Sequence, residues 1–200
     1  GDSIELTFLD YLDTIRLPVR SFIHYNNWYD GSGKDLSIAN FAERVARDFR
    51  VNLDPYGVRV DAMVPDNGWQ NGQSIYQPNA SRFPGGTPEL ALLSDALKAE
   101  GTRLGLWMSL NGYASINRDW ALSQGMEGAT PNERFERFKS YLCIASPNYG
   151  RAIRERLPEL IEACDVAYIK HDFNEMCCIA EGHGHLATDR HGHEASVDVE

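Results

Sequence analysis

A lysine and an aspartate occupy alternate positions in one strand-like run, and this pair could carry nucleophilic chemistry. The run is Tyr168-Ile169-Lys170-His171-Asp172-Phe173-Asn174. Side chains alternate between the two faces of a strand, so Lys170 and Asp172 are expected on the same face. A nearby ammonium favours the ionised carboxylate, which is the form that a nucleophile needs at neutral pH. The pattern equally fits an ion pair that only fixes the strand end, and it does not decide between the two.

Polar and aromatic residues also follow the three earlier strand-like runs. They are Asn26, Asn27 and Trp28, then Asp66, Asn67 and Trp69, then Trp107, Ser109 and Asn111. In the third run, Trp107 is expected on the face opposite to Leu106 and Met108. A tryptophan offers a flat apolar surface for a sugar ring, although a single tryptophan is more often a core residue. Such residues after four successive strands exceed what loop composition requires and predict one shared pocket.

The elements that would position these residues alternate along the chain. Strands are expected at 19–26, 58–64, 103–110 and 166–171, and helices at 6–15, 38–49, 88–100 and 146–164. One or two short helices are expected within 111–140, an extended piece at 141–145, and a kink or break at Pro158. Helices between strands predict a parallel α/β fold with right-handed crossovers. Because all strand ends of a barrel surround one mouth, the clustered polar residues favour a (β/α)₈ TIM barrel over an open sheet.

Composition excludes several classes of function. The chain has 200 residues and a formal net charge of −10, whereas nucleic-acid binders depend on positive charge to neutralise phosphates. No apolar run approaches the ~20 residues of a membrane helix, so neither nucleic acid nor membrane is expected as a partner. The cysteines Cys143, Cys164, Cys177 and Cys178 lack C-x-x-C spacing. They are expected to be buried or free thiols, which slightly favours the cytoplasm over secretion.

Five short segments carry a resemblance that covers nearly the whole chain from Pro18 onward. They are Asn26-Asn27-Trp28-Tyr29, Asp66-Asn67-Gly68-Trp69, Arg82-Phe83-Pro84-Gly85-Gly86, Gly105-Leu106-Trp107 and the run 168–174. In this order they resemble the Asn-Ser-Trp, Asp-Asp-Gly-Trp, Lys-Phe-Pro-x-Gly, Gly-Leu-Trp and Tyr-Ile-Lys-Trp-Asp-Met-Asn segments of one family. That family is the melibiase-type α-galactosidases of glycoside hydrolase family thirty-six and its relatives.

The resemblance implies a retaining glycoside hydrolase that acts on terminal α-linked galactose-like sugars. Asp172 would attack the anomeric carbon and form a covalent glycosyl-enzyme. The residues that would bind the glycoside or oligosaccharide are Asp66, Asn67, Trp28, Trp69, Trp107, Lys170 and Asn174. In this set Asp66 and Lys170 would bind sugar hydroxyls, and the three tryptophans would form the pocket wall. Such a site needs no metal and no organic cofactor.

Four departures from the family pattern leave the exact sugar open. Asn67 replaces a second aspartate, Ser109-Leu110-Asn111 replaces Glu-Pro-Glu, His171 replaces an aromatic residue, and Tyr76 falls about where a pocket tryptophan is expected. An α-N-acetylgalactosaminidase therefore remains an alternative. So do a galactosyl transglycosidase, which shares the covalent intermediate, and a non-catalytic carbohydrate-binding relative.

The second catalytic carboxylate is expected beyond residue 200. A retaining glycosidase needs a general acid/base about 5 Å from its nucleophile, and in the family this residue follows the sixth strand. A (β/α)₈ barrel takes ~250 residues, and four strand–helix units are expected here. We therefore expect 1–17 to be a lead-in helix or linker and 18–200 to be the N-terminal part of a barrel, inactive by itself.

Two histidine pairs suggest a metal-dependent alternative. His183-Gly184-His185 and His191-Gly192-His193 lie in a polar, glycine-rich stretch. Paired histidines can bind zinc, as in a metal-dependent amidohydrolase. A solvated loop explains so short a motif better, and we expect no metal site.

Overall fold

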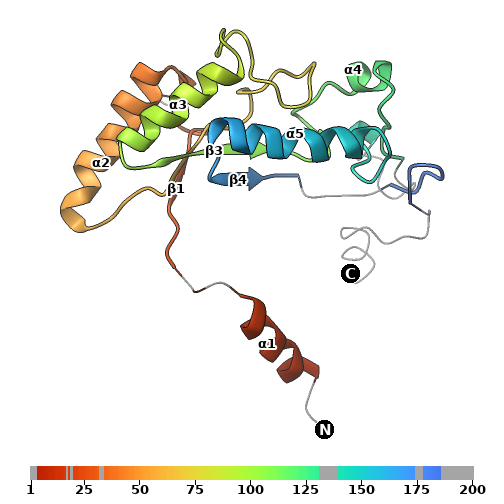
Figure 1. Ribbon diagram of the computed structural model, residues 1–200, viewed down its shortest axis with the longest axis horizontal. Coiled ribbons are helices and arrows are strands. Elements are labelled where there is room, and N and C mark those ends of the chain that lie inside the picture. Colours follow the sequence, from red (N-terminus) through yellow and green to blue (C-terminus); the bar gives the residue numbers. More distant parts are fainter. Residues whose placement is uncertain are drawn as a thin grey trace.

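The fold is built on a parallel sheet. The computed structural model describes residues 4–16, 18, 20–31, 34–130, 139–173 and 178–185. Its four strands are β1 (His24–Asn26), β2 (Ala62–Val64), β3 (Arg103–Met108) and β4 (Tyr168–His171). They lie in the order β1-β2-β3-β4, and each neighbouring pair is parallel (Figure 1). The expected α/β fold is thereby confirmed, as a curled sheet that corresponds to half of a barrel.

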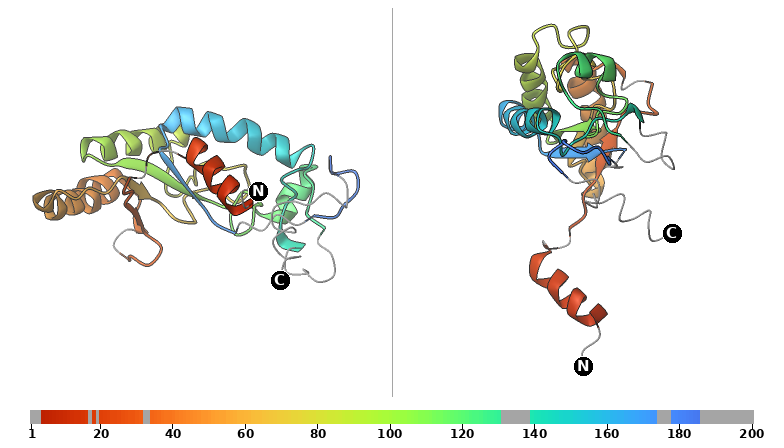
Figure 2. Two further views of the ribbon diagram at one scale, coloured as in Figure 1. Left: turned by 90° about the horizontal axis from the view of Figure 1, so that it is seen from below. Right: turned by 90° about the vertical axis from the view of Figure 1, so that its right-hand side faces the viewer.

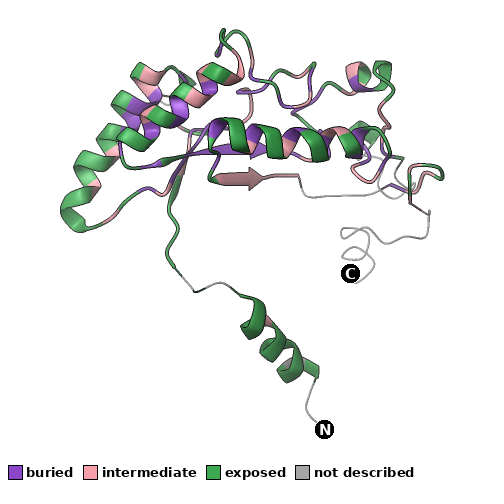
Figure 3. Cartoon of the chain, in the orientation of Figure 1, coloured by how far each residue is buried: buried purple, intermediate pink, exposed green. Residues whose placement is uncertain are grey.

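Helices cover one face of this sheet. The helices α3 (Thr87–Ala99) and α5 (Tyr149–Cys164) pack against each other, and η2 (Ile38–Ala46) packs beside α3 (Figure 2). The remaining elements are α1 (Ile4–Ile15), α2 (Arg47–Leu53), the 3₁₀ turn η3 (Asp54–Tyr56) and α4 (Arg118–Ser123). The main core joins the sheet to the covering helices, and the buried side of each helix faces the sheet (Figure 3).

Alternation along β3 divides the two faces of the sheet as predicted. Leu106 and Met108 lie in the core under the helices, whereas Trp107 packs on the opposite, concave face with Val64 and Tyr168. Apolar side chains on the first face gain burial from the helices, which fixes the register of the strand. The concave face is therefore left for the residues of the expected pocket.

Gly105 allows the strands to approach closely on the concave face. A Cβ atom at this position would lie 2.8 Å from Val64 Cγ2 and 3.2 Å from the Tyr168 carbonyl oxygen. Both are closer than non-bonded atoms tolerate, so a larger residue would push the neighbouring strands apart. The glycine of the Gly-Leu-Trp segment thus serves the curl of the sheet.

The strands are shorter than predicted because other groups take their terminal hydrogen bonds. The Ile23 N–H donates to the Asp61 carboxylate (2.7 Å) instead of to a strand carbonyl, and β1 begins at His24 instead of residue 19. β2 begins at Ala62 instead of residue 58. At the start of β4, the Val166 N–H donates to the Ile161 carbonyl of α5 (3.1 Å). At the end of β3, the Ser109 N–H donates to the Tyr76 hydroxyl (3.2 Å).

Two helical predictions and one extended segment need correction. The helix expected at 38–49 is a π-helix, η2, that continues into α2 as far as Leu53. Pro158 does not break α5, because a proline removes one N–H donor and the rest of this 16-residue helix keeps its hydrogen bonds and its packing. In the segment expected to be extended at 141–145, Leu142 forms an isolated antiparallel bridge with Gly128.

The lead-in helix forms as predicted and lies apart from the sheet (Figures 1 and 2). Leu6, Phe8 and Leu9 are all more than half exposed, and the helix is coloured as exposed along most of its length (Figure 3). Among the described residues, no helix is long and apolar enough to cross a membrane.

Candidate active site

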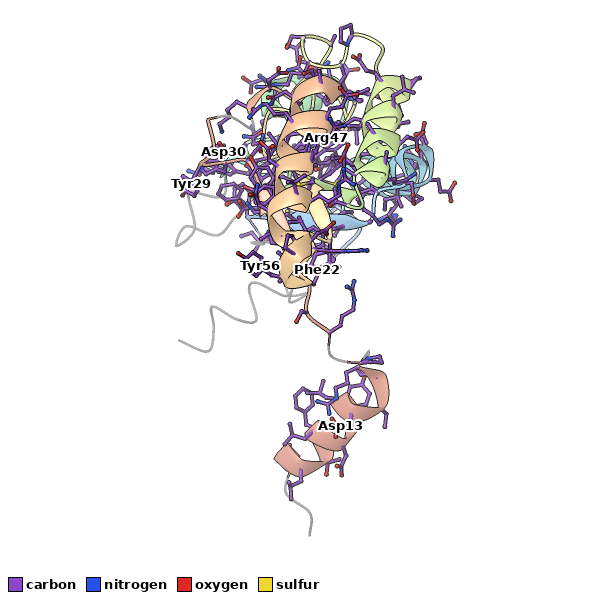
Figure 4. All side chains as sticks on the ribbon, turned by 90° about the vertical axis from the view of Figure 1, so that its left-hand side faces the viewer. Asp13, Phe22, Tyr29, Asp30, Arg47 and Tyr56 are labelled. Atoms are coloured by element: carbon purple, nitrogen blue, oxygen red, sulfur yellow. The ribbon has the colours of Figure 1, made fainter. Side chains whose placement is uncertain are left out.

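A pocket of about 320 Å³ lies at the carboxyl end of the strands, and every strand contributes to it. Its lining comprises Asn26, Trp28, Tyr29, Asp66, Asn67, Trp107, Ala114, Lys170, Asp172 and Phe173. The volume is at the lower end of the ~300–1,000 Å³ that small-molecule sites occupy. Figure 4 shows Tyr29 and Asp30 at the edge of the molecule, on the loop that follows β1. The structure thus brings residues from all four strand ends into one pocket, whereas Trp69, Ser109 and Asn111 of the expected set do not line it.

Asp66 is the centre of a hydrogen-bond network in this pocket. Its Oδ2 accepts from Lys170 Nζ (2.9 Å) and from Asn26 Nδ2 (2.6 Å), and its Oδ1 accepts from the Asn67 N–H (2.8 Å). The Asp66 N–H donates to Asn27 Oδ1 (2.7 Å). Asp66 is only 6% exposed, so its charge is balanced chiefly by Lys170. The network connects the ends of β1, β2 and β4.

Asp172 is held by a different set of donors. Its Oδ2 accepts from Trp107 Nε1 (3.1 Å), and its Oδ1 accepts from the Phe173 N–H (2.9 Å). Its own N–H continues the sheet by donating to the Met108 carbonyl (2.9 Å). Strand pairing therefore places the backbone of Asp172, and the indole of Trp107 orients its carboxylate within the pocket.

The expected pairing of Lys170 with Asp172 is corrected by this geometry. Lys170 lies on the predicted face, but its ammonium bonds Asp66. The reason is the curl of the sheet, which brings the ends of β2 and β4 close together over β3. The lysine therefore neutralises the neighbouring carboxylate instead of the expected one.

Comparison with known proteins finds similarity to α-galactosidases both in sequence and in fold. No protein-family model matches the chain. Alpha-galactosidase C of Emericella nidulans is 30% identical over 139 residues, which are 59% of this chain and 18% of that protein. The chain is similar to α-galactosidases. It spans about a fifth of the length of the curated relatives it matches.

Two solved α-galactosidases share the fold. The first is a family thirty-six (GH36) enzyme of Geobacillus stearothermophilus in complex with 1-deoxygalactonojirimycin, with a TM-score of 0.55, 18% identity, and 76% of this chain and 21% of that chain covered. The second, from Thermus thermophilus in complex with stachyose, has a TM-score of 0.54 and 18% identity and covers 84% of this chain and 36% of that one. At these identities the likeness shows the fold alone.

Trp28 and Trp107 line the pocket, as the α-galactosidase resemblance implies, but Trp69 does not. The Trp69 side chain is fully buried, stacks on Tyr76 at 6.2 Å, and donates from Nε1 to the Trp107 carbonyl (2.8 Å). Sequence spacing placed it at the strand end but could not show that its ring turns inward to fill the core. Trp69 supports the pocket from behind instead of forming its wall.

Of the expected carboxamide positions, the structure describes Asn67 but not Asn174. Asn67 lines the pocket, and its Oδ1 accepts from Gln70 Nε2 (2.8 Å). Asn174 lies outside the described residues. Ser109 and Asn111, which share an expected face with Trp107, are buried instead: Ser109 Oγ donates to Asn111 Oδ1 (2.7 Å), and Asn111 Nδ2 donates to the Phe173 carbonyl (2.5 Å).

Four further residues complete the pocket: Asn26, Tyr29, Ala114 and Phe173. Asn26 appeared among the strand-end residues, but its direct bond to Asp66 depends on the approach of β1 to β2. Phe173 and Ala114 line the pocket with left-handed backbones, at φ values of 52° and 58°. Such conformations are strained for residues other than glycine and gather at functional sites. No sequence signal marks them, because neither is a residue type that favours positive φ.

His171 lies next to the expected nucleophile, but its ring binds a backbone N–H group. Burial lowers the pKa of His171 and outweighs the opposite effect of the Asp172 charge. The neutral ring can therefore accept a hydrogen bond at Nε2 from the Leu110 N–H (3.4 Å). His171, which replaces an aromatic residue of the family pattern, thereby fixes the turn after β3.

A second hollow, of about 220 Å³, lies at the opposite end of the strands between η2, α2 and α3. Its charged group Glu100 is paired with Arg47 and Arg50 at 2.8 and 2.9 Å. Because its buried carboxylate is neutralised by two arginines and the first pocket holds the strand-end carboxylates Asp66 and Asp172, we place the candidate site at the carboxyl end of the strands.

His183 and His185 lie in a loop, as expected, but they are partly buried beside Cys178 and Cys143 instead of solvated. Cys143, Cys164 and Cys178 are buried free thiols, as predicted. Cys177, His191 and His193 lie outside the described residues.

Proposed function

We propose that the protein carrying this chain is a retaining glycoside hydrolase of α-galactosides, with Asp172 as its nucleophile. The observation that carries the proposal is the position of the Asp172 carboxylate, at a strand end and in a pocket to which all four strands contribute polar or aromatic residues. The similarity to α-galactosidases supports the choice of sugar. The departures at Asn67 and His171 leave room for a modified galactose.

The hydrogen bonds to Asp172 suit a nucleophile. Trp107 Nε1 and the Phe173 N–H each bind one carboxylate oxygen and thereby fix the plane of the group. A carboxylate held in one orientation attacks the anomeric carbon with less loss of conformational entropy. The bond that forms joins a carboxylate oxygen to the anomeric carbon while the glycosidic oxygen leaves with a proton from the general acid.

The other side chains would bind and orient the sugar. Asp66 and Lys170 present an acceptor and a donor for hydroxyl groups, and charge-assisted hydrogen bonds of this kind are short and directional. Asn67 adds an amide in the same wall. Trp28 and Trp107 offer apolar ring surface. The Thermus thermophilus α-galactosidase that shares the fold was solved in complex with stachyose, and we propose the same class of oligosaccharide for this pocket.

We place the general acid/base outside the described residues. In the described part of the pocket the carboxylates are Asp66 and Asp172, and Asp66 is committed to Lys170 and Asn26. The outer edges of β1 and β4 have no strand partner among the described residues. In our proposal further strands pair there, close the barrel and supply the acid, so that residues 1–200 alone are inactive.

The stereochemistry of the first product tests this proposal. We would incubate the full-length protein with an aryl α-galactoside and follow the anomeric protons by NMR before mutarotation. The proposal predicts that α-galactose forms first, and that Asp172→Asn lowers kcat by roughly a thousandfold or more. Asp119→Asn, on the exposed first turn of α4, should leave kcat unchanged.

Other outcomes would contradict the proposal in distinct ways. β-Galactose as the first product would show inversion, for which no covalent nucleophile is needed. Binding of galactosides without turnover in the full-length protein would instead indicate a non-catalytic carbohydrate-binding relative. Undiminished turnover in Asp172→Asn would remove Asp172 from the mechanism.

A further inference from the structure

Two cysteines and two histidines converge outside the sugar pocket. They are Cys143, Cys178, His183 and His185, and their ligand atoms all lie within 4.8 Å of one another. Cys143 Sγ is 3.3 Å from His185 Nε2, and Cys178 Sγ is 3.5 Å from His183 Nδ1. None of the four lines the pocket that holds Asp172.

The spacing of these atoms fits a tetrahedral metal ion. Zinc binds thiolate sulfur at about 2.3 Å and imidazole nitrogen at about 2.0–2.1 Å, so a tetrahedron with these bonds has sulfur–nitrogen edges of about 3.5 Å. Both measured sulfur–nitrogen distances agree with this edge. Thiol–imidazole hydrogen bonds alone would explain the Cys143–His185 and Cys178–His183 pairs. They would not require all four ligand atoms to lie within 4.8 Å of one another.

The backbone around the two thiols is already organised for a ligand role. The Thr130 N–H donates to Cys178 Sγ (3.4 Å), and the Ile179 N–H donates to the Thr130 carbonyl (2.8 Å). The Cys143 N–H donates to the Glu127 carbonyl (2.9 Å). Hydrogen bonds in the outer shell of this kind orient metal ligands and tune their basicity.

Gly184 lets the two histidines face the same point. Its φ is +82°, and a Cβ atom here would lie 3.2 Å from the Ala145 carbonyl oxygen. A larger residue would be strained and would push the loop away from the cysteines. The two imidazole rings stand almost perpendicular, at 86°, with centroids 6.1 Å apart, so that their nitrogens approach the thiols from different directions.

We propose that Cys143, Cys178, His183 and His185 bind one zinc ion. All four tetrahedral positions are filled by protein ligands, which is the mark of a structural site, since catalytic zinc keeps one position open. The site joins the segment after β4 to the loop before α5. Tyr113 extends this support to the pocket, because its ring contacts Tyr141 beside the cysteines and Phe173 next to the nucleophile.

Metal analysis of the full-length protein tests the site directly. We would produce the protein without a histidine tag, supply zinc, dialyse against a weak chelator and measure metal by mass spectrometry. The proposal predicts about one zinc per chain and a loss of at least tenfold in retained zinc in Cys143→Ser and in His185→Ala. Cys164→Ala and His24→Ala, which alter a cysteine and a histidine outside the cluster, should retain the metal.

Cobalt substitution gives a readout that does not depend on whether the variants fold. Cobalt(II) in the unsubstituted protein should show the intense visible bands of a tetrahedral ion and a sulfur-to-cobalt charge-transfer band. Absence of bound zinc and cobalt, an octahedral cobalt spectrum, or a Cys143–Cys178 disulfide in protein kept under reducing conditions would each overturn the proposal. Because the readout is metal content, its failure is distinguishable from failure of the proposed glycosidase activity.

Discussion

The ammonium of Lys170 lies 2.9 Å from Asp66 Oδ2, although Lys170 shares a strand face with Asp172. The ion pair crosses over β3 and joins the ends of β2 and β4. Asp172 is left to the indole N–H of Trp107, at 3.1 Å. The two carboxylates in the described part of the pocket therefore have separate partners, and we propose separate roles for them: sugar binding for Asp66 and nucleophilic attack for Asp172.

Replacing Asp66 by asparagine should weaken sugar binding. The change removes the charge that compensates Lys170 and one charge-assisted acceptor, which contribute about 1.5–3 kcal/mol. We expect the affinity of the full-length protein for 1-deoxygalactonojirimycin to fall by roughly 10- to 100-fold in isothermal titration calorimetry. Asp95→Asn, on the exposed side of α3, is the matched control. An unchanged affinity would exclude Asp66 from the binding site.

Replacing Trp107 by phenylalanine should lower kcat more than it changes KM. Phenylalanine keeps a ring in the pocket wall but cannot donate to Asp172 Oδ2, so the carboxylate loses the bond that orients it. The loss of a hydrogen bond to a charged group predicts a fall in kcat of about tenfold or more. Steady-state kinetics with an aryl α-galactoside measure it, with Trp120→Phe as the control. A rise in KM at constant kcat would show that Trp107 only lines the pocket and does not orient Asp172.

Replacing Gly105 by alanine should destabilise the sheet. The new methyl group would lie 2.8 Å from Val64 Cγ2, and overpacking of this kind costs about 1–3 kcal/mol. Urea unfolding of the full-length protein, followed by tryptophan fluorescence, measures the free energy of unfolding. Gly31→Ala serves as the control, because a Cβ atom at Gly31 meets nothing within 4 Å. Equal stability of the two variants would show that the curl does not depend on Gly105.

Replacing Glu127 by glutamine should destabilise the start of α5 in a pH-dependent way. The Glu127 carboxylate accepts from Ser146 Oγ (2.7 Å) and from the backbone N–H groups of Asn148 (3.2 Å) and Tyr149 (3.0 Å). Burial by itself would raise the pKa of Glu127, but these hydrogen bonds outweigh it and the pKa is lowered.

The sign of the effect follows from that direction. A carboxyl whose pKa is lower in the folded state stabilises the protein above its ordinary pKa of about 4.3, and this contribution is lost as the pH falls below that value. We expect Glu127→Gln to lower the free energy of unfolding by about 1–2 kcal/mol at pH 7. The difference from the unsubstituted protein should shrink towards pH 3 in urea titrations. A difference that is constant with pH would mean that the charge of Glu127 plays no part.

Local pattern in the sequence was sufficient for the order of strands and helices and for the face of each side chain in β3, but not for the bounds of the strands. It placed Trp107 and Asp172 correctly because alternation in a strand is a local property. It failed for Lys170 and Trp69, whose contacts depend on how far the sheet curls and on which way a loop ring turns. Both are settled by packing across segments distant in sequence.

The cysteine–histidine cluster shows the same limit more sharply. His183 and His185 lie in a glycine-rich stretch, and Cys143 lies on the far side of α5 and β4 in the chain. No spacing rule links them, because the fold alone brings the two segments together. Equally, the left-handed backbone of Phe173 follows from its surroundings and not from its residue type.

Covalent trapping tests the role of Asp172 most directly. We would incubate the full-length protein with an activated fluorinated α-galactoside, which slows release of the glycosyl-enzyme, and locate the labelled peptide by mass spectrometry. We predict one sugar label on Asp172, absent from Asp172→Asn and present in Asp119→Asn. A label on another carboxylate, or turnover of the activated sugar without any label, would contradict it.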